Sequence, residues 1–150
     1  MILKFLIIIG VVYFSILIFL FVFQRNILFV PDRSAPSLTE TNVPEMSEVN
    51  IETKDGLSLT SWFYRGKVEK PLIIYFQGNA GNISDRDYKA RFLIDNDYSV
   101  LLLGYRGYGG NKGQPSEEGL RKDGEAALEF ASREGFEASN IILYGESLGT

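Results

Sequence analysis

The chain has 150 residues, of which 45% are hydrophobic and 23% are charged, and this composition fits one globular domain of about 100–150 residues together with a strongly apolar segment. Its formal net charge is −4 and it has no cluster of Lys or Arg, which argues against a nucleic-acid partner because phosphates require a basic surface. The absence of Cys and His excludes the usual sites for zinc, haem and iron–sulfur clusters, and no acidic cluster indicates Mg²⁺ or Ca²⁺, so we predict no metal and no cofactor.

The first predicted element is a membrane-spanning helix. Residues 5–23, FLIIIGVVYFSILIFLFVF, carry no charge and lie between Lys4 and Arg25. At 1.5 Å per residue they span about 28 Å, close to the roughly 30 Å hydrocarbon core of a bilayer. The alternative is a signal peptide, whose apolar core is only about 7–15 residues long and precedes a small-residue cleavage site. We predict a single-pass anchor over residues 1–25 in the lipid bilayer, and leave open which side the body faces because basic residues flank both ends.

A linker and a hairpin are predicted next. Residues 26–46 are the predicted linker, because the stretch 31–46 holds three of the five prolines and has no apolar period. Residues 47–150 are the predicted domain, and they begin with two β-rich runs at 49–53 and 57–64. The Asp-Gly pair between these runs favours a tight turn, so we predict an antiparallel hairpin.

Strands then alternate with helices. Apolar runs predict buried parallel strands at 71–78, 99–105 and 141–144. Helices are predicted over 83–96 and from the N-cap Ser116 onward. The second helix has one apolar face, formed by Leu120, Ala127, Leu128 and Ala131. This alternation predicts an α/β sheet.

Two turns at the carboxyl ends of predicted strands carry candidate chemistry. The first is GESLG, residues 145–149, where Gly145 and Gly149 permit the crowded turn that raises Ser147 Oγ above the sheet. The N–H of Leu148 would then face a developing oxyanion. The second is QGNAGN, residues 77–82, in which the N–H of Asn79 is the candidate for a second oxyanion donor. A Gly-x-Ser-x-Gly pentapeptide alone also occurs by chance, and QGNAGN alone could be a connection with helix-capping Asn residues.

Two further groups are predicted to be non-catalytic. The Gly-rich loop 106–115 has neither of the spacings that bind phosphates, so we expect Arg106 to fix the loop. Adjacent residues on such a turn point apart, so we expect Glu146 to be a solvated or rim carboxylate and not a base for Ser147.

Together these segments resemble the α/β-hydrolase superfamily, and within it the small membrane-anchored serine hydrolases. The resemblance extends over the anchor with FVPD, the hairpin, LIIYFQGNAGN, the 106–115 loop and IILYGESLGT. It implies the N-terminal half of an α/β-hydrolase sheet, with Ser147 as nucleophile and the oxyanion hole supplied by Leu148 and the turn at Asn79. Relatives hydrolyse carboxylic esters, thioesters or amides without a metal or cofactor.

The sequence departs from the family pattern in two ways. Gln77 stands where relatives usually have the His of His-Gly-Asn-Ala. The triad acid and histidine of relatives follow the nucleophile, whereas this sequence has no histidine and ends three residues after Ser147. We therefore expect a truncated serine hydrolase that is inactive alone. A split enzyme completed by a C-terminal hydrolase fragment and a membrane-tethered, non-catalytic scaffold remain open as alternatives.

Overall fold

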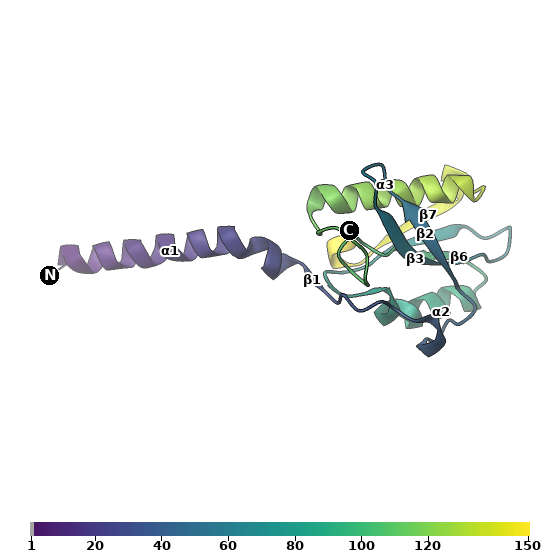
Figure 1. Cartoon of the computed structure of the whole chain (residues 1–150), viewed down its shortest axis with the longest axis horizontal. Coiled ribbons are helices and arrows are strands. Elements are labelled where there is room, and N and C mark those ends of the chain that lie inside the picture. The colour runs from purple at the N-terminus through teal and green to yellow at the C-terminus, as the bar shows by residue number, and fades with distance from the viewer. Residues whose placement is uncertain (1) are drawn as a thin grey trace. The chain divides into compact units, whose positions relative to one another are not determined.

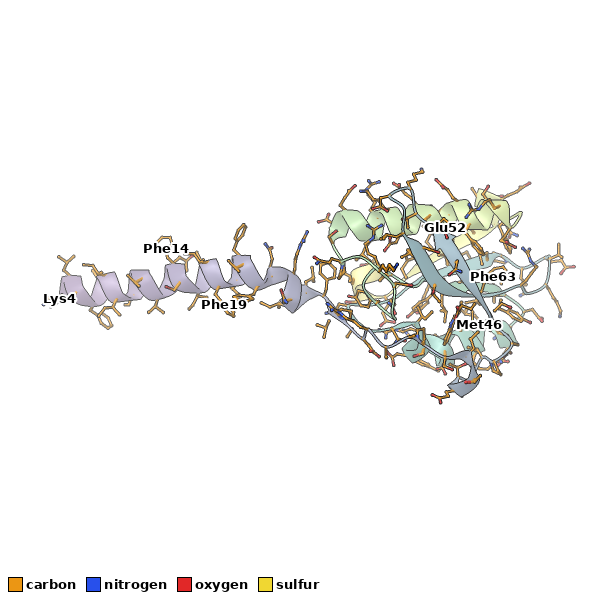
Figure 2. The ribbon with its side chains drawn as sticks, in the orientation of Figure 1. Lys4, Phe14, Phe19, Met46, Glu52 and Phe63 are labelled. Carbon is orange, nitrogen blue, oxygen red and sulfur yellow. The ribbon has the colours of Figure 1, made fainter. Side chains whose placement is uncertain are left out.

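The computed structural model describes residues 2–150, which divide after Val30 into two compact units. The first contains one helix, α1 (Ile2–Leu28), which has no buried residue. Figure 2 shows Phe14 and Phe19 projecting from different sides of this helix. By length and composition α1 can cross a membrane, although a signal sequence near an N-terminus meets the same criteria. The helix extends beyond the predicted apolar core, 5–23, at both ends.

The second unit, residues 31–150, is built on a mixed five-stranded sheet in the order β2-β3-β6-β4-β7. Its strands are β2 (Ser47–Glu52), β3 (Ser58–Tyr64), β4 (Leu72–Phe76), β6 (Ser99–Leu102) and β7 (Ile141–Gly145). β6 pairs antiparallel with β3 and parallel with β4, and β4 pairs parallel with β7. The predicted α/β sheet is confirmed.

Two α-helices cover the sheet, α2 (Asp87–Asp95) on one face and α3 (Glu117–Arg133) on the other (Figure 1). Ser116 caps α3 as predicted, because its hydroxyl accepts a hydrogen bond from the backbone N–H of Gly119 at 3.1 Å. The shorter elements are the strands β1 (Val30–Pro31) and β5 (Ala80–Gly81) and four 3₁₀ turns, η1 (Leu38–Glu40), η2 (Ile83–Arg86), η3 (Ala138–Asn140) and η4 (Ser147–Gly149).

The predicted hairpin is confirmed. β2 and β3 pair antiparallel, with Ile51 opposite Leu59 and Glu52 opposite Ser58. The turn between them needs a residue with positive φ, and Gly56 supplies it with φ +85°. Ile51 and Leu59 are fully buried, so the register directs this side of the hairpin into the core.

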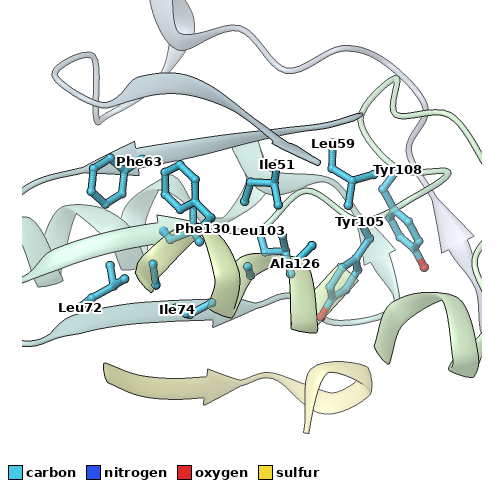
Figure 3. Packing of buried hydrophobic residues seen from close by; sticks show 13 residues of the cluster. Ile51, Leu59, Phe63, Leu72, Ile74, Leu103, Tyr105, Tyr108, Ala126 and Phe130 are labelled. Atoms are coloured by element: carbon cyan, nitrogen blue, oxygen red, sulfur yellow. The ribbon is translucent and has the colours of Figure 1, made fainter. Parts of the chain in front are cut away.

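The core lies on both faces of the sheet because successive residues of a strand point in opposite directions. On β4, Ile74 packs toward α3 and its neighbour Tyr75 packs toward α2. Figure 3 shows the cluster on the α3 side, where Phe63 of the hairpin meets Phe130 of α3 with ring centroids 5.4 Å apart. The two helices therefore complete three layers in residues 31–150.

Of the predicted apolar face of α3, Ala127 and Ala131 are fully buried and Leu120 packs against the core, but the buried face is centred on another side of the helix. Leu128 was expected to face the core, but it is 41% exposed. Asp123 is fully buried, and it lies on the same buried face of α3 as Ala127 and Phe130. The rotation arises because a charged side chain can occupy a core position when an ion-pair partner is present, as Arg106 is for Asp123.

β7 forms where predicted, but the expectation that it is buried is wrong for the described residues. Ile142, Leu143 and Tyr144 are 47%, 56% and 48% exposed. The strand pairs with β4 along one edge, and within residues 2–150 no strand pairs with its other edge. β7 therefore presents large apolar side chains on both faces and an unpaired row of backbone groups.

The segment that leads into the sheet, residues 31–46, contributes to the core. Val43 is fully buried and Met46 is 4% exposed, and both pack in the cluster on the α2 side with Trp62 and Tyr75. The proline-rich composition of this segment did not indicate these contacts. The body of the protein thus begins packing before its first long strand.

Candidate active site

The GESLG turn has the crowded geometry expected from its sequence. Ser147 has φ +52° and is one of two non-glycine residues with positive φ among residues 2–150. Holding such a residue in this region stores about 1–3 kcal/mol of strain. A Cβ at Gly145 would lie 2.4 Å from the carbonyl oxygen of Gly149, and a Cβ at Gly149 would lie 2.4 Å from that of Phe76. The turn therefore requires glycine on both sides of Ser147, whose own side chain is exposed.

The two candidate turns lie next to each other. Gly145 pairs with Phe76 in the β4–β7 ladder, and the N–H of Glu146 donates to the Phe76 carbonyl at 2.9 Å. Gln77, Gly78 and Asn79 follow Phe76 directly. A Cβ at Gly78 would lie 3.0 Å from Oε1 of Glu146. Parallel pairing thus brings the proposed nucleophile turn against the proposed oxyanion turn, residues 77–82.

Hydrogen bonds from distant segments hold the oxyanion turn. The hydroxyl of Tyr108, a residue only 1% exposed, donates to the carbonyl of Asn79 at 2.9 Å. Asn82 caps η2, since its Oδ1 accepts from the N–H of Ser84 and its own N–H donates to Asp85, both at 2.9 Å. Its Nδ2 also donates to Asp32 at 3.0 Å. The Asp32 contact joins the FVPD segment to the turn, and nothing in the local sequence predicted it.

The Gly-rich loop is fixed by Arg106, as predicted. Arg106 is 7% exposed. Its Nε donates to Asp123 at 2.8 Å, and its backbone N–H donates to the same carboxylate at 3.0 Å. Its Nη1 donates to Asp55 in the hairpin turn at 2.8 Å. This network ties α3, the hairpin and the loop that carries Tyr108 together.

Glu146 is not the solvated carboxylate expected from sequence. Its Oε2 accepts hydrogen bonds from Lys89 Nζ at 2.6 Å and from the hydroxyl of Tyr75, and its Oε1 accepts from Arg86 Nη2 at 3.0 Å. The Glu146 side chain is 30% exposed, Lys89 26% and Arg86 13%. We call these four residues the elbow cluster. Arg86 and Lys89 belong to the segment that directly follows the oxyanion turn.

None of the elbow cluster can act as a base toward Ser147 near neutral pH. Burial raises the pKa of Glu146, but hydrogen bonds from Lys89 and Tyr75 and the charge of Arg86 outweigh it and lower that pKa to about 2. The hydrogen bond to Glu146 raises the pKa of Lys89 above its usual value, and burial raises the pKa of Tyr75 to about 12. A carboxylate with so low a proton affinity, an ammonium and a neutral phenol are all poor proton acceptors.

The sequence contains no histidine that could accept the proton of Ser147 Oγ. The predicted site residues are thus brought together as two adjoining turns, while a proton acceptor for the hydroxyl is not found among residues 2–150. Those residues also contain no group of three or more Asp or Glu side chains that could hold a metal ion.

Gln77 occupies a buried position on the oxyanion turn. It is 1% exposed, and neither its amide nitrogen nor its amide oxygen finds a hydrogen-bond partner within residues 2–150. An unpaired buried amide lowers stability by about 1–3 kcal/mol. This is the position where the sequence departs from the His-Gly-Asn-Ala pattern, and the departure leaves the turn with an unsatisfied side chain.

An apolar hollow lies beside the elbow cluster. It has a volume of about 340 Å³ and is lined by Tyr88, Lys89, Phe92, Leu93 and Tyr144. Tyr88 and Phe92 are 61% and 68% exposed, so α2 and β7 share one open apolar surface.

Comparison with known proteins gives a consistent picture. No family model matches the chain. It is 35% identical to the alpha/beta hydrolase domain-containing protein WAV2 of Arabidopsis thaliana over 138 residues, which is 85% of this chain and 44% of that protein. It is 35% identical to the uncharacterized protein Rv2307c of Mycobacterium tuberculosis over 145 residues, 95% of this chain and 52% of that protein. The chain therefore spans about half the length of these curated relatives.

Solved structures show the same fold. The chain resembles the esterase Pf2001 of Pyrococcus furiosus with a TM-score of 0.65 and 20% identity, over 81% of this chain and 48% of that one. It resembles an alpha-beta hydrolase from Vibrio vulnificus with a TM-score of 0.66 and 24% identity, over 78% of this chain and 43% of that one. Here too the chain corresponds to about half of each structure.

Proposed function

We propose that this chain, which belongs to the α/β-hydrolase superfamily, carries the nucleophile and the oxyanion hole of a membrane-anchored serine hydrolase. In this proposal Ser147 attacks the carbonyl carbon of an ester, thioester or amide. The backbone N–H groups of Leu148 and Asn79 stabilise the oxyanion that forms.

The observation that carries the proposal is the backbone of the GESLG turn. Ser147 has positive φ between two glycines that leave no room for a Cβ, and this strained turn adjoins the 77–82 turn. Strain of this kind persists only where the surrounding structure enforces it, and it is concentrated at active sites. An ordinary connection between β7 and a following segment would not need it.

The proposal requires a general base from outside these 150 residues. Serine is a weak nucleophile until an adjacent base takes its proton, and the chain contains no histidine. The elbow cluster does not replace it, because its carboxylate has a pKa of about 2. We therefore expect residues 1–150 alone to show no steady turnover of esters.

The test is to supply the part of a relative that this chain does not cover. Residues 1–150 would be joined to the part of Rv2307c that lies outside the matched region, and the product treated with a fluorophosphonate probe. We expect the probe to label Ser147, with no labelling of Ser147→Ala and none of residues 1–150 alone. Labelling that survives Ser147→Ala, or a fully folded hybrid that the probe does not label, would refute the assignment of Ser147.

The membrane part of the proposal rests on α1. This helix has 27 residues, which corresponds to about 40 Å at 1.5 Å per residue, enough to cross a hydrocarbon core of roughly 30 Å with some tilt. We expect the whole chain to remain in the membrane pellet after alkaline carbonate extraction. A shortened, soluble product that lacks residues 1–25 would show a cleaved signal sequence instead.

A second candidate, a hydrolase split between two polypeptides, is favoured by β7. Its free edge and its exposed Ile142, Leu143 and Tyr144 are what a further parallel strand from another chain would cover. Expressing residues 1–150 and the Rv2307c portion as separate chains tests this candidate. Co-purification together with probe labelling would support it, and labelling only of the covalently joined hybrid would oppose it.

A further inference from the structure

We propose that Glu146 is a positioning residue whose carboxylate couples the nucleophile turn to the oxyanion turn. The coupling is a property of the folded chain, whereas its consequence for acyl transfer rests on the proposed function. The proposal follows from where the partners of Glu146 lie.

The partners of Glu146 come from the segment that directly follows the oxyanion turn. Arg86 is the last residue of η2, and Lys89 lies in the first turn of α2. Their hydrogen bonds to Glu146, at 3.0 and 2.6 Å, bridge 60 and 57 positions along the chain. Glu146 itself immediately precedes Ser147. One carboxylate therefore links the residue before the nucleophile to the segment that begins where the 77–82 turn ends.

The carboxylate also lies directly against the oxyanion turn. Oε1 of Glu146 would be 3.0 Å from a Cβ at Gly78, and Arg86 Nη2 would be 3.5 Å from it. Gly78 is buried, so a Cβ there would crowd the Glu146 carboxylate. Gly78 thus leaves the space in which the carboxylate and Arg86 meet, next to the backbone of Asn79.

The strength of the link follows from its chemistry. Hydrogen bonds between ionised partners are shorter and roughly twice as strong as neutral ones. All three side chains are at most 30% exposed, so water screens them less than surface pairs. The hydroxyl of Tyr75, on β4, donates a further hydrogen bond to Oε2 of the same carboxylate. Glu146 therefore has partners on β4, η2 and α2 at once.

Hydrogen exchange on the full 150-residue chain in detergent micelles tests the coupling without any need for activity. Glu146→Gln keeps the shape of the side chain and removes its charge. We expect amide exchange to become about tenfold faster or more in both 77–86 and 145–150, because charge-assisted bonds that hold each segment are lost. Faster exchange confined to 145–150, or no change in either segment, would overturn the proposal.

Matched variants separate coupling from general loss of stability. Glu45→Gln removes a carboxylate that pairs with Arg91 of α2 away from the elbow, and we expect it to leave both segments unchanged. Lys89→Met removes the charge from the other side of the pair and should reproduce the pattern of Glu146→Gln. Lys89→Arg keeps the charge and should restore slow exchange. If Glu146→Gln does not fold, Lys89→Met against Lys89→Arg decides the question, and equal exchange in those two variants refutes the coupling.

The probe assay distinguishes this inference from the proposed function. In the hybrid with the Rv2307c portion, Glu146→Gln should slow labelling of Ser147 about tenfold while the pH dependence of labelling keeps its shape, since a positioning group does not transfer the proton. If Glu146→Gln removed the fall in labelling rate at acid pH, Glu146 would be acting as a base, and the positioning role would be refuted. If Ser147 is not labelled at all, the proposed function fails, but the exchange result still decides the coupling.

Discussion

The two turns of the candidate site differ in how they are held. The oxyanion turn, residues 77–82, is held at both ends: Tyr108 donates a hydrogen bond to the Asn79 carbonyl, and the carboxylates of Asp85 and Asp32 accept hydrogen bonds from Asn82. The nucleophile turn, residues 145–149, is held by β4 and by the elbow cluster on one side, and β7 leading to it is largely exposed. The oxyanion turn is therefore tied to several segments of the body, whereas the nucleophile turn is contacted on one side only.

This difference shows which turn the contacts within residues 31–150 hold most firmly. The oxyanion turn depends on a buried ion-pair network and on packing that residues 31–150 complete by themselves. The nucleophile turn depends on a few specific contacts, so small changes should loosen it locally without unfolding the body. The following variants test that contrast, beginning with the largest expected effect.

Asp123→Ala should give the largest loss of stability, because it breaks the buried network that supports the oxyanion turn. Removing this fully buried carboxylate leaves the Arg106 guanidinium with Asp55 alone, and breaking a buried pair in this way lowers the free energy of unfolding by about 3–5 kcal/mol. Chemical denaturation measures the change. Glu129→Ala on the same helix, an exposed partner of Lys54, is the control and should cost about 0–1 kcal/mol. Equal effects of the two variants would contradict the importance of the buried network.

Gly149→Ala should loosen the nucleophile turn. The added Cβ would stand 2.4 Å from the carbonyl oxygen of Phe76, and relieving that overlap should cost about 1–3 kcal/mol. We expect the loss as faster amide exchange in 145–150, with the denaturation midpoint of the body almost unchanged. Gly10→Ala, where a Cβ meets nothing within 4 Å, provides the comparison. A large shift of the global midpoint would show that the turn is integral to the core.

Tyr108→Phe should weaken the oxyanion turn more mildly. The variant keeps the buried ring and removes the hydroxyl that donates to the Asn79 carbonyl, for an expected loss of about 0.5–1.5 kcal/mol. Amide exchange should quicken more in 77–82, where the hydroxyl donates, than in 145–150. The exposed Tyr88→Phe should change neither. Exchange that rises equally in both turns would mean that they respond as one element.

The titration of Glu146 gives the last prediction: its contribution to stability should be constant near neutral pH and should disappear in acid. Its folded pKa is lowered to about 2 from an ordinary value of 4.5, so its ionised form stabilises the fold above pH 4.5, and that contribution is lost as pH falls toward 2. The stability difference between wild type and Glu146→Gln should therefore shrink from pH 5 to pH 2. A difference that stays constant over this range would exclude an ionised Glu146 as its source.

Local sequence signals predicted the elements and the shape of the nucleophile turn. The Asp-Gly hairpin, the apolar strands and the GESLG turn are determined by steric rules that act within a few residues, so they can be recognised without knowing the partners. The structure agrees with each of these predictions in position.

Long-range electrostatics could not be predicted in the same way. The burial of Asp123 depends on Arg106, and the contacts of Glu146 depend on Arg86 and Lys89, which the sheet topology brings close. A charged residue considered without its partners is expected to face solvent. For this reason the predicted apolar face of α3 differed from the buried one, and Glu146 was expected at a rim. The exposure of β7 also depends on topology, because an apolar run does not reveal whether both edges of its strand are paired.

The position of β7 in the chain has a consequence for synthesis on the ribosome. Leu72 to Phe76, to which β7 is hydrogen-bonded, are translated before it, as are both α2 and the Arg106 loop. The four-stranded platform β2-β3-β6-β4 can thus assemble while the nascent polypeptide is still attached, because chains fold from the N-terminal side as they emerge. Ser147 can enter its strained backbone conformation only when β7 docks on that platform, so the shape of this turn is set by strand docking and not by the nascent turn alone.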